Sequence, residues 1–382
     1  MTAAEATRDA HGSEGLTLIT GGAGFVGSNL AHRLLSAGER VLVLDNLSRA
    51  GVADNLEWLR TQHGARLSVM TGDVRDAAAV REAVAQARRV FHFAAQVAVT
   101  TSLDDPRTDF EVNALGTLNV LEAARRQAVP PSVLITSTNK VYGALDDVPL
   151  QLGDEGYAPQ DAQLAAHGIG EDRPLDFHSP YGCSKGAADQ YVRDYARSFG
   201  LPTVVLRMSC IYGQRQFGTE DQGWVAHFLL RALQGEPLTL YGDGQQVRDV
   251  LHVDDLLDAM LRLDARMDTL RGQVFNVGGG PANTVSLRRM VALIEAMQGA
   301  PMRLGYDGWR TGDQRYYVSD TRALQAATGW LPRVGVAEGL HRLRDWLHER
   351  LGQTAARSAA EAGAGVAQAV QVPAPLQGKE AA

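Results

Sequence analysis

The sequence of 382 residues predicts an α/β fold, in which a doubly wound parallel sheet is joined to a smaller α/β lobe. Short, wholly apolar runs such as Val41 to Leu44 are typical of parallel strands that are buried on both faces. They alternate with helical patterns through about the first 213 residues, which predicts the sheet. The alternation breaks at about Gln214, which predicts the second lobe.

The composition excludes several classes of function. Apolar residues make up 45% of the chain and charged residues 21%, which is ordinary for a globular protein, and the net charge is −7. The chain has no long basic run of the kind that binds nucleic acid, and no apolar stretch approaches the ~18 residues of a membrane span. The two cysteines, Cys183 and Cys210, are too few for a disulfide framework, which favours a reducing cytoplasm. We predict no metal site.

The first predicted strand, Leu16 to Thr20, enters the run G-G-A-G-F-V-G and then a helix. The glycines allow a tight turn that lets a pyrophosphate sit against the helix N-terminus, where free N–H groups attract anions. Strand, glycine turn and helix in this order predict a dinucleotide site. The predicted contacts in this turn are Gly21, Gly24, Phe25, Val26 and Gly27.

The second strand, Val41 to Leu44, ends in Asp45. A carboxylate at that position can accept hydrogen bonds from an adenosine ribose and repels a 2′-phosphate, so NAD is favoured over NADP. Arg49 weakens this preference, because it could pair with such a phosphate, and a simple strand-end cap is the other interpretation of Asp45. Asn46 and Ser48 complete the contacts predicted here.

Two further strands, Arg66 to Met70 and Val90 to Ala94, are each followed by residues suited to a cofactor. An Asp after the first would lie near the adenine, although it could equally cap a turn. Small residues after the second would let the backbone approach the nicotinamide ribose. The contacts predicted at these strand ends are Asp73, Val74, Ala94, Ala95 and Gln96.

A long helix is predicted from Asp109 to Gln127, with Asn113 inside it. A buried Asn would need partners, so it could brace the strands that carry the site; a solvent-facing Asn is equally compatible with the pattern. The fifth strand, Val133 to Thr136, leads to Ser137 and Thr138, beyond the carboxyl end of a central strand where open α/β sheets bind ligands. The Thr138 hydroxyl could bond a reacting alcohol, or simply belong to a strand-end turn.

The run S-P-Y-G-C-S-K opens a helix that extends to about Phe199. Tyr181 and Lys185 lie four residues apart and therefore project from one face of it. An unperturbed Tyr titrates near pH ~10, and a nearby ammonium favours the phenolate that an acid–base catalyst needs. A Tyr and a Lys on an ordinary amphipathic helix are the alternative. Residues 144–179 before it are too long for a simple loop and predict a substrate-covering flap.

The sixth strand, Thr203 to Cys210, contains Met208, which we assign to the cofactor site. The smaller lobe carries loop arginines that suit a diphosphate, because guanidinium forks match phosphate oxygens; singly, each is more often a surface residue. The arginines are Arg215, Arg248 and Arg315. Trp224 could stack on a pyrimidine, although a Trp at a helix start is more often part of a core.

The predicted organisation has four parts. They are a disordered leader at 1–14, a dinucleotide-binding domain at 15–213 with parts of 240–285, a substrate lobe at 214–239 and 285–351, and a disordered tail at 352–382.

Four motifs together resemble the extended short-chain dehydrogenase/reductases of the NAD-dependent epimerase/dehydratase family that act on nucleotide sugars. They are G-G-A-G-F-V-G, D-N-L-S-R, S-T-N-K-V-Y-G and S-P-Y-G-C-S-K, and the resemblance covers about residues 15–350. The runs at Asp176 to Tyr191 and Arg215 to Trp224, with Q-V-R-D-V-L-H, are similar to the branch of CDP-paratose 2-epimerases.

This resemblance implies a Rossmann-type domain, a Thr138–Tyr181–Lys185 triad, NAD kept bound through turnover, and a nucleoside-diphosphate sugar in the cleft. It implies that Tyr181 takes a hydroxyl proton while hydride passes to NAD, that a transient keto sugar turns its other face, and that hydride returns with inversion. Lys185 would lower the pKa of the phenol and hold the nicotinamide ribose.

Related 4,6-dehydratases carry Asp-Glu after the Thr, where this chain has Asn139 and Lys140, so dehydration is not expected. Asn139 could bond a sugar hydroxyl, and Lys140 could support it or carry a second proton. Thr100 is also assigned to the substrate site.

The function expected from these features is inversion at C2 of a CDP-hexose. The alternatives are a UDP-hexose 4-epimerase and, from another class, a non-catalytic NAD-binding regulatory protein. The resemblance further suggests a homodimer formed through the helices at 109–127 and 181–199.

Overall fold

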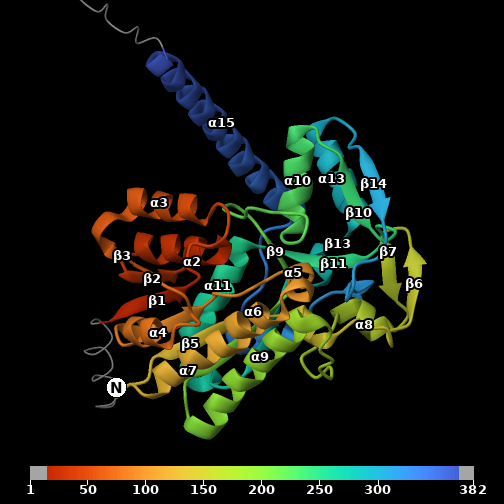
Figure 1. Ribbon diagram of the computed structural model, residues 1–382. Coiled ribbons are helices and arrows are strands. Elements are labelled where there is room, and N and C mark those ends of the chain that lie inside the picture. Colours follow the sequence, from red (N-terminus) through yellow and green to blue (C-terminus); the bar gives the residue numbers. More distant parts are fainter. Residues whose placement is uncertain (1–14, 370–382) are drawn as a thin grey trace, which may run out of the picture.

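The computed structural model describes residues 15–369, with side chains as far as Gly352. Its centre is a seven-stranded parallel sheet in the order β12-β8-β5-β4-β1-β2-β3. Figure 1 shows the sheet with its flanking helices. The strands are β1 (Leu16–Thr20), β2 (Val41–Asp45), β3 (Leu67–Thr71), β4 (Ala87–His92), β5 (Ser132–Thr138), β8 (Thr203–Met208) and β12 (Val274–Val277). The predicted doubly wound sheet is therefore confirmed. The strand order reverses between β1 and β4, and such sheets bind ligands outside the carboxyl ends of the strands at this point.

Helices cover both faces of the sheet. Successive strand residues such as Val43 and Leu44 point to opposite faces, and each packs into a separate apolar core. One face packs against α2 (Phe25–Ser36), α3 (Val52–His63), α11 (Val253–Asp264) and α14 (Arg322–Thr328). The other packs against α4 (Ala77–Val84), α7 (Gly116–Arg125) and α9 (Ser179–Phe199). Short helices α5 (Val99–Asp104), α6 (Pro106–Phe110) and α12 (Met267–Leu270) complete this domain.

The helix predicted from Asp109 to Gln127 is interrupted. The chain forms α6, then a π-helical turn at Glu111–Leu115, and then α7. The turn carries Asn113, whose side chain bonds groups on both sides of it. A π-helical turn is rare and is often found at functional sites, and this one faces α9.

The smaller lobe is built around β11 (Val247–His252), which pairs with β13 (Thr284–Ser286), β15 (Tyr316–Tyr317) and β9 (Cys210–Tyr212). A second sheet pairs β10 (Leu238–Tyr241) with β14 (Leu304–Asp307). The helices are α10 (Trp224–Gln234), α13 (Leu287–Gln298) and α15 (Val336–Ala369). Their apolar faces share one core, which includes Phe228, Val291 and Leu343.

Residues 144–178 contain elements that the sequence did not predict. A hairpin of β6 (Leu150–Gly153) and β7 (Gly156–Pro159) is followed by α8 (Ala162–His167). The hairpin packs on the smaller lobe, where the Tyr157 N–H donates to the Gln245 carbonyl at 3.0 Å. The segment is thus a folded insertion that contacts both lobes, because Ile169 and Glu171 accept hydrogen bonds from Asn276 of β12.

Two predicted boundaries differ from the structure. Leu324 of α14 and Trp330 pack into the core beneath the large sheet, so this part of the predicted substrate lobe belongs to the other domain. The disordered tail was predicted to begin at 352, but the last helix, α15, continues to Ala369, because its alanine-rich sequence favours helix. The predicted leader at 1–14 and the end of the tail, 370–382, lie outside the described residues.

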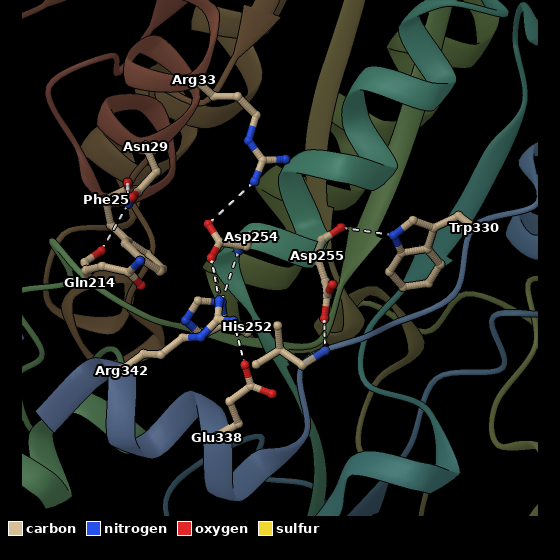
Figure 2. Close-up of polar contacts among 11 residues, drawn as sticks. Phe25, Asn29, Arg33, Gln214, His252, Asp254, Asp255, Trp330, Glu338 and Arg342 are labelled. Carbon is tan, nitrogen blue, oxygen red and sulfur yellow. Dashed lines mark hydrogen bonds and ion pairs between the residues drawn. The ribbon is translucent and has the colours of Figure 1, made fainter. Parts of the chain in front are cut away.

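Polar contacts at the start of α11 fasten the lobes together (Figure 2). The Asp254 carboxylate pairs with Arg33 of α2 at 3.5 Å and with Arg342 of α15 at 3.0 Å. His252 caps the helix by accepting a hydrogen bond from the Asp254 N–H. Burial lowers the pKa of His252, which keeps its ring in the neutral form that can accept this bond.

Two further residues in Figure 2, Asp255 and Asn29, fix segments that cross between the lobes. The Asp255 carboxylate accepts from the Val334 N–H at 2.8 Å, and its carbonyl accepts from the Trp330 indole at 2.9 Å. The Asn29 side chain donates to the Phe25 and Gln214 carbonyls at 2.8 and 3.0 Å. The first turn of α2 is therefore tied to the start of the smaller lobe.

Candidate active site

A cavity of about 590 Å³ lies between the two domains, beyond the carboxyl ends of β5 and β8. Both lobes line it, which is a common setting for a small-molecule site. The predicted residues found in its wall are Phe25, Val26, Thr100, Ser137, Thr138, Asn139, Lys140, Tyr181, Met208, Trp224 and Arg248. No residue of 144–178 lines it, so the prediction of a substrate-covering flap was wrong.

Tyr181 and Thr138 meet in this wall. Tyr181 lies in the first turn of α9, where Pro180 is tolerated because a first-turn N–H has no helical partner. Thr138, at the end of β5, lies close enough to the Tyr181 hydroxyl to lower the pKa of the phenol, and its own hydroxyl accepts from the Lys140 N–H at 3.2 Å. Lys185, one turn further along α9, is buried beneath them, and its ammonium donates to the Thr136 carbonyl at 2.6 Å. The three predicted triad residues are thus brought together.

The electrostatics of the phenol differ from the prediction. Burial raises the pKa of Tyr181 to about 12, with a smaller rise from Asp109, while Thr138 and Arg49 lower it. Burial lowers the pKa of Lys185 to about 8. Desolvation of the phenolate therefore outweighs the effect of its cationic surroundings in this structure. A further positive charge near the phenol would be needed to bring its pKa towards neutral.

A buried polar network holds the first turns of α9. The Asn113 side chain accepts from the Gln96 N–H at 2.9 Å and donates to Asp109 at 3.1 Å and to Ser184 at 3.0 Å. The Ser184 hydroxyl in turn bonds Asp109. Through these hydrogen bonds Asn113, in the π-helical turn, joins the loop after β4 to α9. Of the two predicted roles of Asn113, the structure shows the bracing role. A solvent-facing Asn113 is excluded because only 1% of the residue is exposed.

Two cations lie next to the triad. The Lys140 ammonium donates to the Gly312 carbonyl at 3.0 Å and lies 3.7 Å from the Asp313 carboxylate. Arg248 donates to the same carboxylate at 2.6 Å. Burial raises the pKa of Asp313, but the two cations outweigh this effect and hold that pKa below its ordinary value. Burial lowers the pKa of Lys140. The side chain of Asn139 donates to Gln314 at 3.2 Å, which joins β5 to the same loop.

Two of the three predicted arginines lie elsewhere. Arg215 lines a separate cavity with Trp58 and Trp346, and its guanidinium stacks on Trp58. Arg315 is exposed between Tyr157 and Trp309. Both arginines were assigned to the substrate site only because they lie in loops of the smaller lobe. The direction of a loop side chain depends on packing between segments that are distant in the sequence.

Sequence reasoning missed several residues of the cavity wall. Arg310 lies over the ring of Tyr241 at 3.8 Å and forms an ion pair with Asp221 at 3.4 Å. Asp313 and Gln246 also line the wall. These residues could have been found from their nearness in sequence to predicted ones. Arg310 and Asp313 share a loop with Arg315, and Gln246 lies two residues before Arg248.

Comparison with known proteins identifies the family. A model of the NAD dependent epimerase/dehydratase family matches residues 17–278. The chain belongs to this family. It is 44% identical to the CDP-paratose 2-epimerase of Salmonella typhi over 86% of this chain and 98% of that relative. It is 34% identical to the UDP-glucose 4-epimerase of Mycolicibacterium smegmatis, over 85% and 96% of the two chains. A solved UDP-glucose 4-epimerase of Thermus thermophilus, in complex with NAD, superposes with a TM-score of 0.72 at 33% identity, over 87% and 98%.

The epimerase/dehydratase family takes its name in part from NAD, and the turn after β1 fits a dinucleotide. A Cβ at Gly27 would meet the Gly21 carbonyl oxygen at 2.3 Å, so only glycine lets the turn close this tightly. Gly24, at the N-cap of α2, provides no side-chain cap, which leaves the first N–H groups of the helix available to an anion.

The predicted adenosine contacts gather at the ends of β2 and β3. Asp45 accepts from the Ala23 N–H at 3.0 Å and from the Leu47 N–H at 2.9 Å, so it also holds the glycine turn. Asn46 donates to Asp73 at 2.9 Å, and Arg49 donates to Gln222 of the smaller lobe at 2.6 Å. Ser48 and Val74 lie in the segments that follow β2 and β3, while Ala94 and Ala95, which were predicted beside the nicotinamide ribose, follow β4.

Proposed function

We propose that this protein is an NAD-dependent nucleotide-sugar epimerase that inverts C2 of a CDP-hexose through a transient keto sugar. The observation that carries the proposal is that Tyr181 and Thr138 lie in the wall of one cavity between the two lobes, with Lys185 buried one turn further along α9. Two hydroxyls at one point suit proton transfer to and from a sugar alcohol.

NAD would be held by the turn from Gly21 to Gly27, by Asp45, and by the loop from Ala94 to Gln96, with Tyr181 and Lys185 near the nicotinamide end. When bound, it supplies a hydride acceptor and, in the oxidised form, a positive charge. Asp45 favours NAD over NADP, and Arg49 is engaged by Gln222 in place of a 2′-phosphate. These roles rest on the geometry of the turn and on the strand ends.

The chain's own residues would manage the proton and hold the sugar. Tyr181 takes the proton from the hydroxyl on the carbon that is oxidised, and returns it after the keto sugar has turned. Thr138 polarises that hydroxyl, and Lys185 favours the phenolate. Lys140 and Arg248 suit the diphosphate, and Asn139 suits a sugar hydroxyl.

The choice of C2 chemistry rests on the relative with 44% identity, which is named for it. Dehydration is disfavoured because Asn139 and Lys140 provide no carboxyl pair for removing water. A UDP-hexose 4-epimerase is the second candidate, because several relatives carry that name. A non-catalytic regulator is disfavoured by the assembled triad.

The test is turnover of purified protein with CDP-hexoses in D2O, followed by NMR. We expect the 2-epimer without deuterium at C2, because the same hydride leaves and returns. Deuterium at C2 would instead favour deprotonation chemistry, and inversion at C4 of a UDP-hexose would favour the second candidate. Absence of turnover with both classes of sugar would favour a regulatory role.

We also propose a homodimer that forms through α6, α7 and α9. Phe110 on α6 is 56% exposed and Tyr191 on α9 is 48% exposed, and such apolar surfaces are common at interfaces. Light scattering after size exclusion should give twice the chain mass, and Tyr191→Glu with Phe110→Glu should give a monomer. A monomeric unsubstituted protein would refute this assembly.

We expect the protein to act in the cytoplasm, since Cys183 and Cys210 are both free thiols. Among the described helices, none has both the length and the apolar character needed to cross a membrane.

A further inference from the structure

A second cavity, of about 680 Å³, lies outside the active site, between α3 of the large domain and α15 of the smaller lobe. Among the described residues, it shares no wall residue with the active-site cavity. Trp58 and Trp346 contribute two indole rings to its wall, and Arg215 contributes a guanidinium. Arg215 was predicted to bind a diphosphate, and the active site leaves it without a role. A cavity of this size can hold a small molecule of its own.

The guanidinium of Arg215 is stacked on an aromatic ring. Its central carbon lies 2.9 Å from the centroid of the Trp58 ring. A guanidinium this close can only lie parallel to the ring, because an edge-on approach would drive a nitrogen into it. The N–H groups lie in the plane of the guanidinium, so they point sideways past the ring and remain available as donors.

These donors have no partner within the part of the chain that the structure describes. The Arg215 side chain forms no hydrogen bond and no ion pair there, and none of its nitrogens is fully buried, so a ligand in the cavity can reach them. Burial lowers the pKa of Arg215 to about 10, and the nearby Glu349 carboxylate offsets only part of this effect. The cation is therefore partly desolvated without a paired counter-ion, which an anionic ligand would supply.

The other charges of the wall are already paired with one another. Asp54 forms an ion pair with Arg350 at 2.9 Å, and Glu57 lies 3.8 Å from Arg60. These carboxylates neutralise the arginines beside them. Arg215 is thus the wall arginine that is left for an anionic ligand.

The backbone holds Arg215 in an uncommon conformation. Its φ angle is +67°, in the left-handed region that few residues other than glycine adopt. The Asn55 side chain of α3 donates to its carbonyl at 3.3 Å, and Asn29 of α2 donates to the preceding carbonyl, that of Gln214, at 3.0 Å. Contacts with the large domain therefore hold a strained residue at the cavity, and strain of this kind clusters at ligand-binding positions.

We propose that this cavity is a second ligand site, which binds an oxyanion, the phosphate or carboxylate group of a small molecule, at the guanidinium of Arg215. The planar fork of N–H donors matches two oxygens of such a group. The next residue, Gln216, lines the active-site cavity, so the ligand would adjoin the active site through the backbone without entering it. The proposal does not depend on the proposed reaction.

The experiment is calorimetric titration of the full-length protein with inorganic pyrophosphate and with citrate, which represent the two kinds of oxyanion. We expect a saturable site in the unsubstituted protein whose affinity falls by roughly tenfold or more in Arg215→Met. Pyrophosphate bound at the active site would appear in both proteins alike. The probe that binds more tightly assigns the site to phosphate or to carboxylate, and thermal melts check that each variant is folded.

Arg60→Met is the matched control, because Arg60 lines the same cavity but already lies beside Glu57. It should keep the site. Identical titrations of the unsubstituted protein and folded Arg215→Met, an equal loss in Arg60→Met, or binding of neither probe would overturn the proposal.

A second measurement uses the unsubstituted protein and therefore does not depend on the folding of a variant. Crystals soaked in selenate, an oxyanion with an anomalous scatterer, should show anomalous density beside Arg215. The absence of that density would overturn the proposal. Selenate at Arg215 without a saturable site in solution would mean an adventitious ion only, and would overturn it as well.

Discussion

Tyr181 has a pKa of about 12 because it is buried, and yet its place beside Thr138 suits it to carry a proton. The two facts are compatible if the phenol is activated only in the loaded enzyme, where further positive charge favours the phenolate. If the phenol stays protonated between turnovers, the empty site avoids the free-energy cost of burying a phenolate charge.

Tyr181→Phe should reduce kcat by about 10² to 10⁴-fold, the range for loss of a general acid–base group. Bound NAD, measured by absorbance and by release on denaturation, should be unchanged, because the ring remains. Serine at position 138 keeps a hydroxyl, so Thr138→Ser should retain more activity than Thr138→Val. A Phe variant with unimpaired kcat would remove Tyr181 from the chemistry.

Lys185 predicts a dependence of stability on pH. Burial lowers its pKa from 10.5 to about 8, so between these values the unfolded chain binds more protons than the folded one. The resulting loss of stability is fully present below pH 8 and is relieved as the pH rises towards 10.5.

Lys185→Met should therefore raise the free energy of unfolding at pH 7 by on the order of 1–2 kcal/mol while abolishing turnover. The gain should shrink between pH 8 and 10, as measured by urea unfolding at each pH. Tyr181→Phe is the control, since a phenol with a pKa of about 12 remains protonated throughout this range. A Met variant less stable than the parent at pH 7 would contradict the argument.

At the scale of elements, the π-helical turn shows why a helix pattern does not fix a helix. The apolar spacing from Phe110 to Leu121 predicted one continuous element. Bonds from Asn113 to Gln96 and Ser184 are made with residues far away in sequence, and these contacts accompany the change in winding. Local periodicity contains no information about such partners.

Asn113→Ala should lower the free energy of unfolding by about 2–3 kcal/mol, because it leaves buried groups of Asp109 and the Gln96 backbone without their partner. It should also reduce the NAD that copurifies, because Gln96 belongs to the predicted ribose loop. Asn119→Ala, at a less buried site on α7 that contacts Val74 and Arg75, should lower the free energy of unfolding by less. Equal losses in the two variants would count against a special role for the turn.

At the scale of the molecule, the junction at α11 combines two contacts of unequal value. The Asp255 carboxylate accepts from the N–H groups of Arg333 and Val334, of which the second is buried, whereas Arg342 forms ion pairs that are partly exposed. Asp255→Ala should therefore cost about 2–4 kcal/mol, and Arg342→Ala less than about 1 kcal/mol. Guanidinium unfolding of both variants tests the ranking, and a reversed order would refute it.

The sheet, the glycine turn and the shared helix face of Tyr181 and Lys185 could be predicted because each depends on a short, local pattern: apolar runs, glycine spacing, and a four-residue helical repeat. The cavity wall could not, since Arg215 and Arg310 sit in similar loops and only packing between distant segments decides which one faces inward. The hairpin at 150–159 was missed because its contacts are with the smaller lobe. The pKa of Tyr181 was misjudged because burial cannot be read from spacing.

The path of the chain between the lobes has a consequence for dissection of this protein. Strand β12 and helices α11 and α14 return to the large sheet after the chain has entered the smaller lobe at Gln214. A fragment ending at Gly213 would lack an edge strand and much of the covering on one face. Neither half can therefore be produced as an autonomous piece by a single cut, and a protease that nicked one linker would leave the two parts interlocked.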